Sequence, residues 1–274
     1  MIFSNHAHIF PTELREDGDI AHLLELLDAC EIDKSVCFAP FASRFHESAL
    51  FCDKNVNEWL ASQIEGNDRL VGFGTVDVSE LAKRPIADQV KQIHDLGFKG
   101  VKVHPAFQSL KVNGEKAYQI YEQAERLGLF VSFHTGLHWH RISDYQMLLF
   151  DDITWDFPNL NFSLEHVGGY SMFRLALLVM CNNKKNPHVF AGLTSVEPEN
   201  GHLGPWTLTD EELETLIYQT GDDRTMFGLD FPYKGIDYVK SAMARIRRLN
   251  ISDEAKANIL GGTLERMLFK EDKA

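Results

Sequence analysis

Several features that mark large classes of protein are missing from the sequence. No apolar run is long enough to span a bilayer. The chain does not open with a basic segment followed by an apolar core, so no signal peptide is expected. Only four cysteines occur among 274 residues, and no two of them form a CxxC pair. Scattered cysteines are typical of free thiols in a reducing compartment, so a cytoplasmic protein is predicted.

Positive charge is scarce, and so are nucleotide-binding and nucleophile motifs. The 27 Lys and Arg residues face 40 Asp and Glu residues, a net charge of −13 that disfavours nucleic acids and membranes as partners. No GxGxxG or P-loop motif follows an early strand, which disfavours an open doubly wound sheet. Ser195 has no GxSxG context, so a serine nucleophile is not expected. We therefore expect a small-molecule substrate as the partner. The sequence does not decide whether the chain forms a homo-oligomer.

What the chain does contain is a regular alternation of strand-like and helix-like segments. With 44% hydrophobic residues it can bury a large core. Short apolar, β-branched runs predict eight strands at residues 2–9, 35–39, 70–76, 100–104, 129–134, 161–166, 188–193 and 225–230. Apolar residues at helical spacing predict helices at 20–29, 56–64, 86–96, 115–127, 174–181, 210–218 and 238–249, and a last helix capped by Ser252.

The spacing of these segments predicts the fold. Strand starts recur about every thirty residues, as in repeated βα units. Several strands are apolar throughout, as in a parallel sheet that is covered on both faces. No linker rich in glycine, serine or proline divides the chain. We therefore predict an α/β protein with a single (β/α)8 TIM barrel domain over residues 1–274.

Polar side chains close five of the eight predicted strands. His6 and His8 lie two residues apart in an extended segment, so both side chains point the same way. Four more polar residues end later strands, in chain order His104, His134, His166 and Asp230. The carboxyl ends of barrel strands meet at the active-site face. Imidazole and carboxylate groups are ligands of zinc and similar ions, so this convergence predicts a metal site.

This order of residues resembles that of the amidohydrolase superfamily. The segments HAHIFP, GVKVHP and FGLDFPY are similar to its second group, metal-dependent barrel hydrolases that also include non-oxidative decarboxylases of aromatic and unsaturated acids. The closing ILGGTLERML is similar to the last helix of that group, so the resemblance covers nearly the whole chain. Two residues outside the proposed ligands depart from the pattern: Asn5 stands where Asp is frequent, and Thr263 where Asn is usual.

The resemblance implies a role for each strand-end residue. His6, His8 and His134 would be metal ligands, and Asp230 would be a fourth ligand or the catalytic carboxylate. One divalent ion is expected rather than two, with Zn²⁺ first and Mn²⁺ as the alternative. A bound cation lowers the pKa of its water to about 7. Asp230 would accept the proton of that water and pass it to the leaving group. His166 would donate to the substrate carbonyl or carboxylate, or ligate a second ion.

Other polar residues near the strand ends are predicted to bind substrate. His104 would contact substrate or a second metal ion. Arg44, after strand two, would bind a substrate carboxylate, and Trp139, after strand five, would set specificity, with loop packing as the alternative for both. Lys102 shares a face with His104 and is expected to hydrogen-bond inside the barrel, with a carboxylated lysine bridging two ions as the alternative. Glu165 has the opposite phase to the histidine after it, so we expect it between barrel and helices, paired with a cation.

Four functions are compatible with this chemistry. The first is a metal-dependent hydrolase that cleaves a small-molecule amide, lactone or ester with metal-activated water. The second is a non-oxidative decarboxylase of a small aromatic or unsaturated carboxylic acid on the same barrel. The third, a metal-dependent deoxyribonuclease, would usually have a carboxylate where His104 stands, and the net charge of −13 disfavours it. The fourth is a non-catalytic metal-binding barrel.

Overall fold

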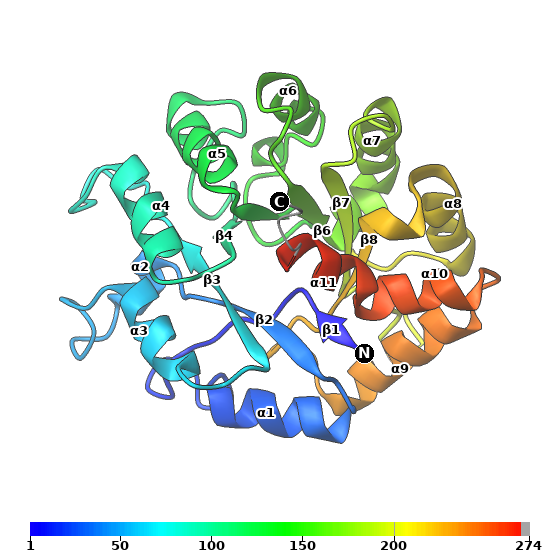
Figure 1. The fold of residues 1–274 in the computed structure, drawn as a ribbon, viewed down its shortest axis with the longest axis horizontal. Coiled ribbons are helices and arrows are strands. Elements are labelled where there is room, and N and C mark those ends of the chain that lie inside the picture. The colour runs from blue at the N-terminus through cyan, green and yellow to red at the C-terminus, as the bar shows by residue number, and fades with distance from the viewer. Residues whose placement is uncertain (200, 270–274) are drawn as a thin grey trace.

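Eight parallel strands form a nearly closed barrel in the computed structural model, which describes residues 1–199 and 201–269. Each strand pairs with the next in the order of the sequence. The predicted (β/α)8 barrel is thus confirmed, and Figure 1 shows the helices arranged around it. The strands are β1 (Phe3–Ser4), β2 (Lys34–Phe38), β3 (Leu70–Thr75), β4 (Gly100–Val103), β5 (Phe130–His134), β6 (Phe162–Glu165), β7 (Val189–Thr194) and β8 (Thr225–Gly228).

The seam between the first and last strands is made of single hydrogen bonds rather than a regular ladder. The backbone N–H of Asn5 donates to the carbonyl of Phe227 over 2.9 Å, and the N–H of Asp230 donates to the carbonyl of His6 over 3.0 Å. The predicted strand over residues 2–9 is regular only at Phe3–Ser4, because the residues after it bond singly to both neighbouring segments. This seam places the N-terminal motif directly beside the end of β8.

Helices cover the outside of the barrel. The predictions at 20–29, 56–64 and 115–127 are confirmed at both ends, and Ser252 caps its helix as predicted. The helices α2 and α6 have no counterpart among the predictions. The helix α7 begins at Gly169 rather than at residue 174, because glycine has a low helix propensity and the sequence pattern therefore does not indicate this start. The helices are α1 (Ile20–Ala29), α2 (Ala42–Phe45), α3 (Val56–Ile64), α4 (Ile86–Asp95), α5 (Glu115–Leu127), α6 (Leu149–Asp156), α7 (Gly169–Asn182), α8 (Asp210–Thr220), α9 (Ile236–Arg248), α10 (Asp253–Ala257) and α11 (Thr263–Leu268).

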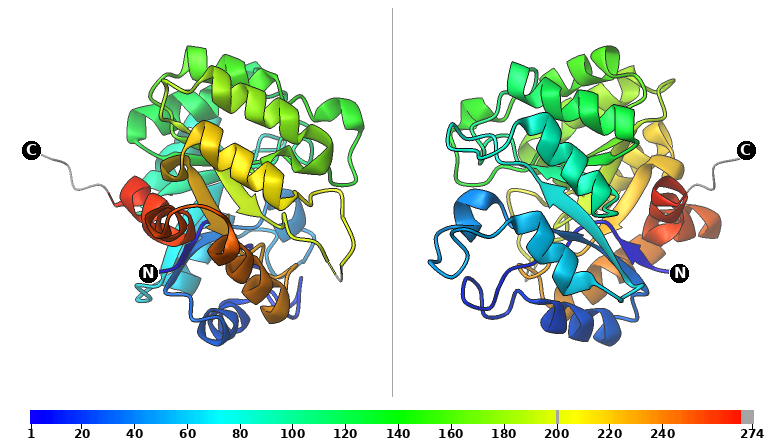
Figure 2. Two further views of the ribbon diagram at one scale, coloured as in Figure 1. Left: turned by 90° about the vertical axis from the view of Figure 1, so that its right-hand side faces the viewer. Right: turned by 60° about the vertical axis from the view of Figure 1, so that its left-hand side comes forward.

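The barrel interior is apolar at the end where the strands begin. Leu264 and Leu268 of α11 close this end, and Figure 2 shows α11 on the same side of the molecule as the N-terminus. The polar residues at the carboxyl ends of the strands lie at the opposite end of the barrel. None of the helices in the described part of the chain is long and apolar enough to cross a membrane. The interior layer consists of Phe3, Val36, Phe38, Val71, Phe73, Phe130, Phe190 and Met226.

Candidate active site

Three strands end in backbone conformations that non-glycine residues rarely adopt. His166 after β6 (φ 64°), Ser195 after β7 (φ 55°) and Asp230 after β8 (φ 61°) all lie in the left-handed region. Such conformations cost of order 1 kcal/mol or more each and collect at functional sites. Each left-handed residue interrupts the alternation of side chains between the two faces of its strand. Its own polar side chain is buried at the end of the barrel.

His6, His8 and Asp230 come together at the barrel seam. Nε2 of His6 lies 3.0 Å from Nε2 of His8. Oδ1 of Asp230 lies 3.5 Å from the first nitrogen and 3.9 Å from the second. Atoms bonded at about 2.1 Å to one divalent ion are separated by about 3.0–3.5 Å, so these three atoms have nearly the spacing of a ligand set. The structure thus joins the N-terminal motif to the aspartate near the other end of the chain.

Glu165 lies inside the barrel, and the prediction that it faces the helices and pairs with a cation is wrong. The phase argument fails because β6 ends at Glu165, and the left-handed turn at His166 points that next side chain inward as well. Gly192 leaves the necessary room, since a Cβ there would lie 2.1 Å from Oε2 of Glu165. The buried carboxylate accepts hydrogen bonds from Asn5, His6, Ser132, Ser163 and Thr194.

The carboxylate of Glu165 decides the tautomer of His6. Nδ1 of His6 lies 3.1 Å from Oε2 of Glu165, so this nitrogen carries the proton and Nε2 presents its lone pair to the seam. A carboxylate behind a ligating histidine is the usual arrangement at metal sites. Position 5 holds Asn where Asp is frequent in the pattern that the sequence resembles. The structure gives a reason: Nδ2 of Asn5 donates to both oxygens of Glu165, and a carboxylate at this position could not donate.

His134 and His166 form a second pair of facing nitrogens. Nδ1 of His166 donates to the carbonyl of Thr194 over 2.7 Å, and Nε2 of His134 donates to the carbonyl of Gly136 over 2.8 Å. The remaining atoms, Nε2 of His166 and Nδ1 of His134, lie 3.1 Å apart with one lone pair each. Two lone pairs at this distance repel each other unless a cation neutralises them, so this pair also has the donor chemistry of a metal site.

Burial keeps these imidazoles neutral. It is the largest cause of the lowered pKa of His6, His8 and His134, and it lowers the pKa of His166 to about 3. The positive charge of Lys102 lowers all four pKa values further. Neutral imidazole is the form that binds a metal ion.

Asp230 is held through both of its oxygens. Oδ2 accepts a hydrogen bond from the hydroxyl of Ser195, while Oδ1 faces His6 and His8. Burial raises the pKa of Asp230, and the bond from Ser195 opposes that shift. Sequence reasoning excluded Ser195 as a nucleophile but missed its role in orienting the carboxylate, because the contact depends on two turns from different strands. The residues present therefore fit a divalent cation held by His6, His8 and Asp230. His166 lies between this group and His134, with ring centroids 5.5 Å from that of His6 and 4.5 Å from that of His134, so the role of His134 as a ligand stays a prediction.

The strand β4 adds two polar side chains to the interior. Lys102 is 1% exposed, and burial lowers its pKa to about 8. Its Nζ has no hydrogen-bond partner among the described residues, so the hydrogen bonds predicted for it are absent. The ring of His104 stacks on that of His134, with the ring centroids 3.9 Å apart. Ring nitrogens of His104, His138 and His140 lie within 4.8 Å of one another.

The loop residues predicted to bind substrate have exposed side chains. Arg44 lies in α2 and pairs with Glu47 over 3.1 Å. Trp139 is 95% exposed. The tryptophan that packs into the site is Trp206, whose ring centroid lies 4.4 Å from that of His166. From the sequence, Trp206 in the glycine-rich segment after the seventh predicted strand is a candidate to set specificity, with loop packing as the alternative. The structure places its ring against those of His134 and His166.

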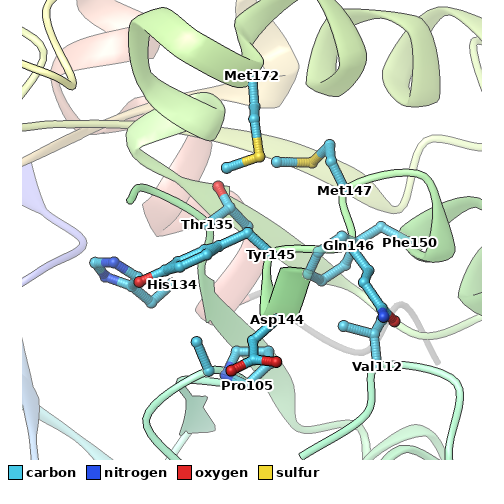
Figure 3. A pocket seen from close by; sticks show the side chains of 11 residues that line it. Pro105, Val112, His134, Thr135, Asp144, Tyr145, Gln146, Met147, Phe150 and Met172 are labelled. Carbon is cyan, nitrogen blue, oxygen red and sulfur yellow. The ribbon is translucent and has the colours of Figure 1, made fainter. Parts of the chain in front are cut away.

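A small, mainly apolar pocket lies beside His134 (Figure 3). The side chains of Met147 and Met172 approach each other across it, whereas the imidazole of His134 points away from both methionines. The space is about that of one water molecule, so it is a gap with an apolar lining and has no room for a whole ligand. The lining residues are Pro105, Ala106, Val112, His134, Thr135, Asp144, Tyr145, Gln146, Met147, Phe150 and Met172.

The parallel barrel, with buried imidazoles and a carboxylate at its strand ends, has the features of a metal-dependent barrel enzyme. The chain belongs to the amidohydrolase family, whose model matches residues 6–270, and the resemblance seen in the motifs is confirmed. A curated relative, the 2-amino-3-carboxymuconate-6-semialdehyde decarboxylase of Dictyostelium discoideum, is 20% identical over 243 residues, which are 79% of this chain. The match spans 66% of the length of that relative.

Two solved structures show the same fold. A dihydroxybenzoic acid decarboxylase from Polaromonas sp. JS666, with bound manganese and the inhibitor 2-nitroresorcinol, superposes with a TM-score of 0.69 and 17% identity over 97% of this chain and 96% of that one. A candidate 2-pyrone-4,6-dicarboxylic acid hydrolase from Pseudomonas putida superposes with a TM-score of 0.69 and 16% identity over 97% of each chain.

Proposed function

We propose that this protein is a divalent-metal-dependent, non-oxidative decarboxylase of a small aromatic or unsaturated carboxylic acid. The observation that carries the proposal is the set of His6, His8 and Asp230, buried apart from the partly exposed His8, whose spacing suits one cation. The curated relative and the manganese-containing neighbour, both decarboxylases by name, support this reaction over the other chemistry of the family. Zn²⁺ and Mn²⁺ both suit imidazole and carboxylate ligands.

The chain's own groups would orient the acid and deliver a proton. When bound, the cation supplies an electrophile for oxygen atoms of the substrate. The reaction breaks the bond to the carboxyl carbon and releases CO₂, and the remaining carbon keeps the electron pair and takes up one proton. Asp230, oriented by the bond from Ser195 to Oδ2, would carry that proton on Oδ1 in a step in which Oδ1 is not bound to the cation and His6 and His8 hold the ion. His166 keeps its own proton on Nδ1, so its Nε2 would accept a hydrogen bond rather than donate one as the sequence suggests.

The test is CO₂ release from a panel of aromatic and unsaturated acids by protein loaded with Zn²⁺ or Mn²⁺. His6→Ala and Asp230→Ala should each lower turnover by about a thousandfold or more while the circular dichroism spectrum stays unchanged. His94→Ala, which removes an exposed imidazole on α4, should retain wild-type activity. Wild-type activity in either site variant under metal-replete conditions would refute the site, and the absence of CO₂ from every acid would refute the reaction.

Hydrolysis of a small amide, lactone or ester is the second candidate. The observation that favours it is Oδ1 of Asp230, which lies 3.5 Å from Nε2 of His6, where a general base for water would be needed. The fold shared with the candidate pyrone dicarboxylic acid hydrolase supports the same reaction. Lactone and amide panels followed by acid titration separate the two reactions, because hydrolysis produces a new acid group and no CO₂.

A further inference from the structure

The end of β4 carries two buried hydrogen-bond donors that have no acceptor. Nζ of Lys102 and Nε2 of His104 both lack a partner among the described residues. Lys102 is 1% exposed and His104 7% exposed. The two residues are two positions apart in extended chain, so their side chains share the interior face. Leaving a buried donor unpaired is costly, and more so for a charged one, so two adjacent cases point to a ligand.

The backbone assigns His104 the role of a donor. The N–H of Phe107 donates to Nδ1 of His104 over 3.2 Å, so the proton of the neutral ring lies on Nε2. The backbone N–H of His104 is bound by the side chain of Gln108, and its ring lies flat against that of His134. These contacts hold the ring in place, and Nε2–H is directed away from its own backbone.

The protein itself supplies no acceptor for Lys102. Nζ lies over the face of the Phe38 ring, 4.6 Å from its centroid. The two carboxylates of the interior have other partners: Glu165 accepts from five side chains, and Asp230 accepts from Ser195. The ammonium therefore brings a positive charge into the site that Glu165 and Asp230 attract from a distance but that no described residue hydrogen-bonds.

A second cation is the other ligand to consider here, because nitrogens of His104, His138 and His140 lie within 4.8 Å of one another. The tautomer of His104 disfavours a cation, since Nε2 presents a proton rather than a lone pair. The ammonium of Lys102 on the same face would also repel a cation. An anion, in contrast, satisfies both orphaned donors.

We propose that Lys102 and His104 form a carboxylate-binding subsite, in which the ammonium of Lys102 binds one oxygen and Nε2–H of His104 binds the other. The inference deepens the proposed function and rests on it only in taking the bound acid to be the substrate. The ring centroids of Phe41 and Phe107 lie 6.4 and 5.9 Å from that of His104, so the body of the acid has aromatic surface next to the subsite. The ligand class is a small monocarboxylate with a flat apolar body.

Binding of benzoate and benzamide to the manganese-loaded protein, measured by calorimetry, tests the subsite without turnover. Lys102→Met removes the charge at similar length, and His104→Phe removes the donor but keeps the ring. We expect benzoate affinity to fall about tenfold or more in each variant, and benzamide affinity to change by less than about twofold. Lys99→Met, the same change at an exposed position just before β4, should bind both probes as the wild type does.

Several outcomes would overturn the subsite. One is unchanged benzoate affinity in Lys102→Met with full manganese content, and another is benzamide binding to the wild type as tightly as benzoate, a comparison that needs no variant. A second equivalent of manganese per chain that His140→Ala removes would show a cation site instead. If benzoate binding follows the expectation while no acid releases CO₂, the subsite stands and the proposed reaction fails.

Discussion

Three of the imidazoles in the site each owe their tautomer to one identifiable partner. Glu165 holds the proton of His6 on Nδ1, the carbonyl of Thr194 does the same for His166, and the N–H of Phe107 leaves the proton of His104 on Nε2. These partners decide which atom of each ring is a lone pair and which is a donor. The same residue type therefore serves two kinds of ligand at one end of the barrel.

For single residues, the first prediction concerns Glu165→Gln. The amide has nearly the same shape but is a weaker acceptor for Nδ1–H of His6, so affinity for Mn²⁺ should fall by about 10- to 100-fold. Competition with a chelator of known affinity measures the change. Glu122→Gln, on the exposed face of α5, is the matched control and should bind Mn²⁺ as the wild type does. Equal affinity in Glu165→Gln and the control would contradict the supporting role of this carboxylate.

The second prediction concerns Lys102 and pH. Burial lowers the pKa of Lys102 from 10.5 to about 8, so below pH 8 the lysine is charged in both states and burying its charge opposes folding. Between pH 8 and 10.5 the folded chain loses that proton first, and the penalty fades. Lys102→Met should therefore be more stable than the wild type at pH 7, by about 2–3 kcal/mol, and the gain should shrink at pH 10.

Urea unfolding of both proteins at the two pH values measures this difference. Lys99→Met supplies the control, because its lysine is exposed and the variant should show no stability gain that changes with pH. A stability difference that is the same at pH 7 and pH 10 would show that the charge of Lys102 is not the cause.

The elements of the barrel divide stability and chemistry between its two ends. The turns after β6, β7 and β8 carry the strained polar residues, whereas α11 seals the other end with Leu264 and Leu268. The predicted strands and helices largely agree with the structure, because their apolar periodicity reflects burial that the barrel does provide. The missed features are α2, α6 and the early start of α7, which are short helices between strands or begin at glycines, so their apolar periodicity is weak.

A prediction at the scale of elements follows for Leu264→Ala. The side chain is 1% exposed and packs into the closed end of the barrel, so the free energy of unfolding should fall by about 2–5 kcal/mol. Affinity for Mn²⁺ should stay unchanged, because the candidate ligands lie at the opposite end. Leu81→Ala, at a position that is 88% exposed, controls for the loss of a leucine. A matching loss of metal affinity in Leu264→Ala would contradict the separation of the two ends.

The whole molecule is expected to depend on its metal ion for both activity and stability. Chelation should abolish turnover and lower the melting temperature, and addition of Zn²⁺ or Mn²⁺ should restore both. At a hundredfold excess over the dissociation constant the ion contributes about 2.7 kcal/mol, which raises the melting temperature of a protein of this size by roughly 5–10 °C. His6→Ala should show little of this shift in differential scanning calorimetry. A wild-type melting temperature that is the same with and without the metal ion would contradict the candidate metal site.

The sequence by itself determined the barrel and the set of polar residues at its carboxyl end. Both follow from local patterns: apolar periodicity for each element, and the common direction of parallel strands, which brings His6, His8 and Asp230 to one end. Only the tertiary structure decided the inward position of Glu165, the bond from Ser195 to Asp230 and the unpaired state of Lys102. These depend on left-handed turns and on partners from distant strands, and no periodicity of a single strand encodes either.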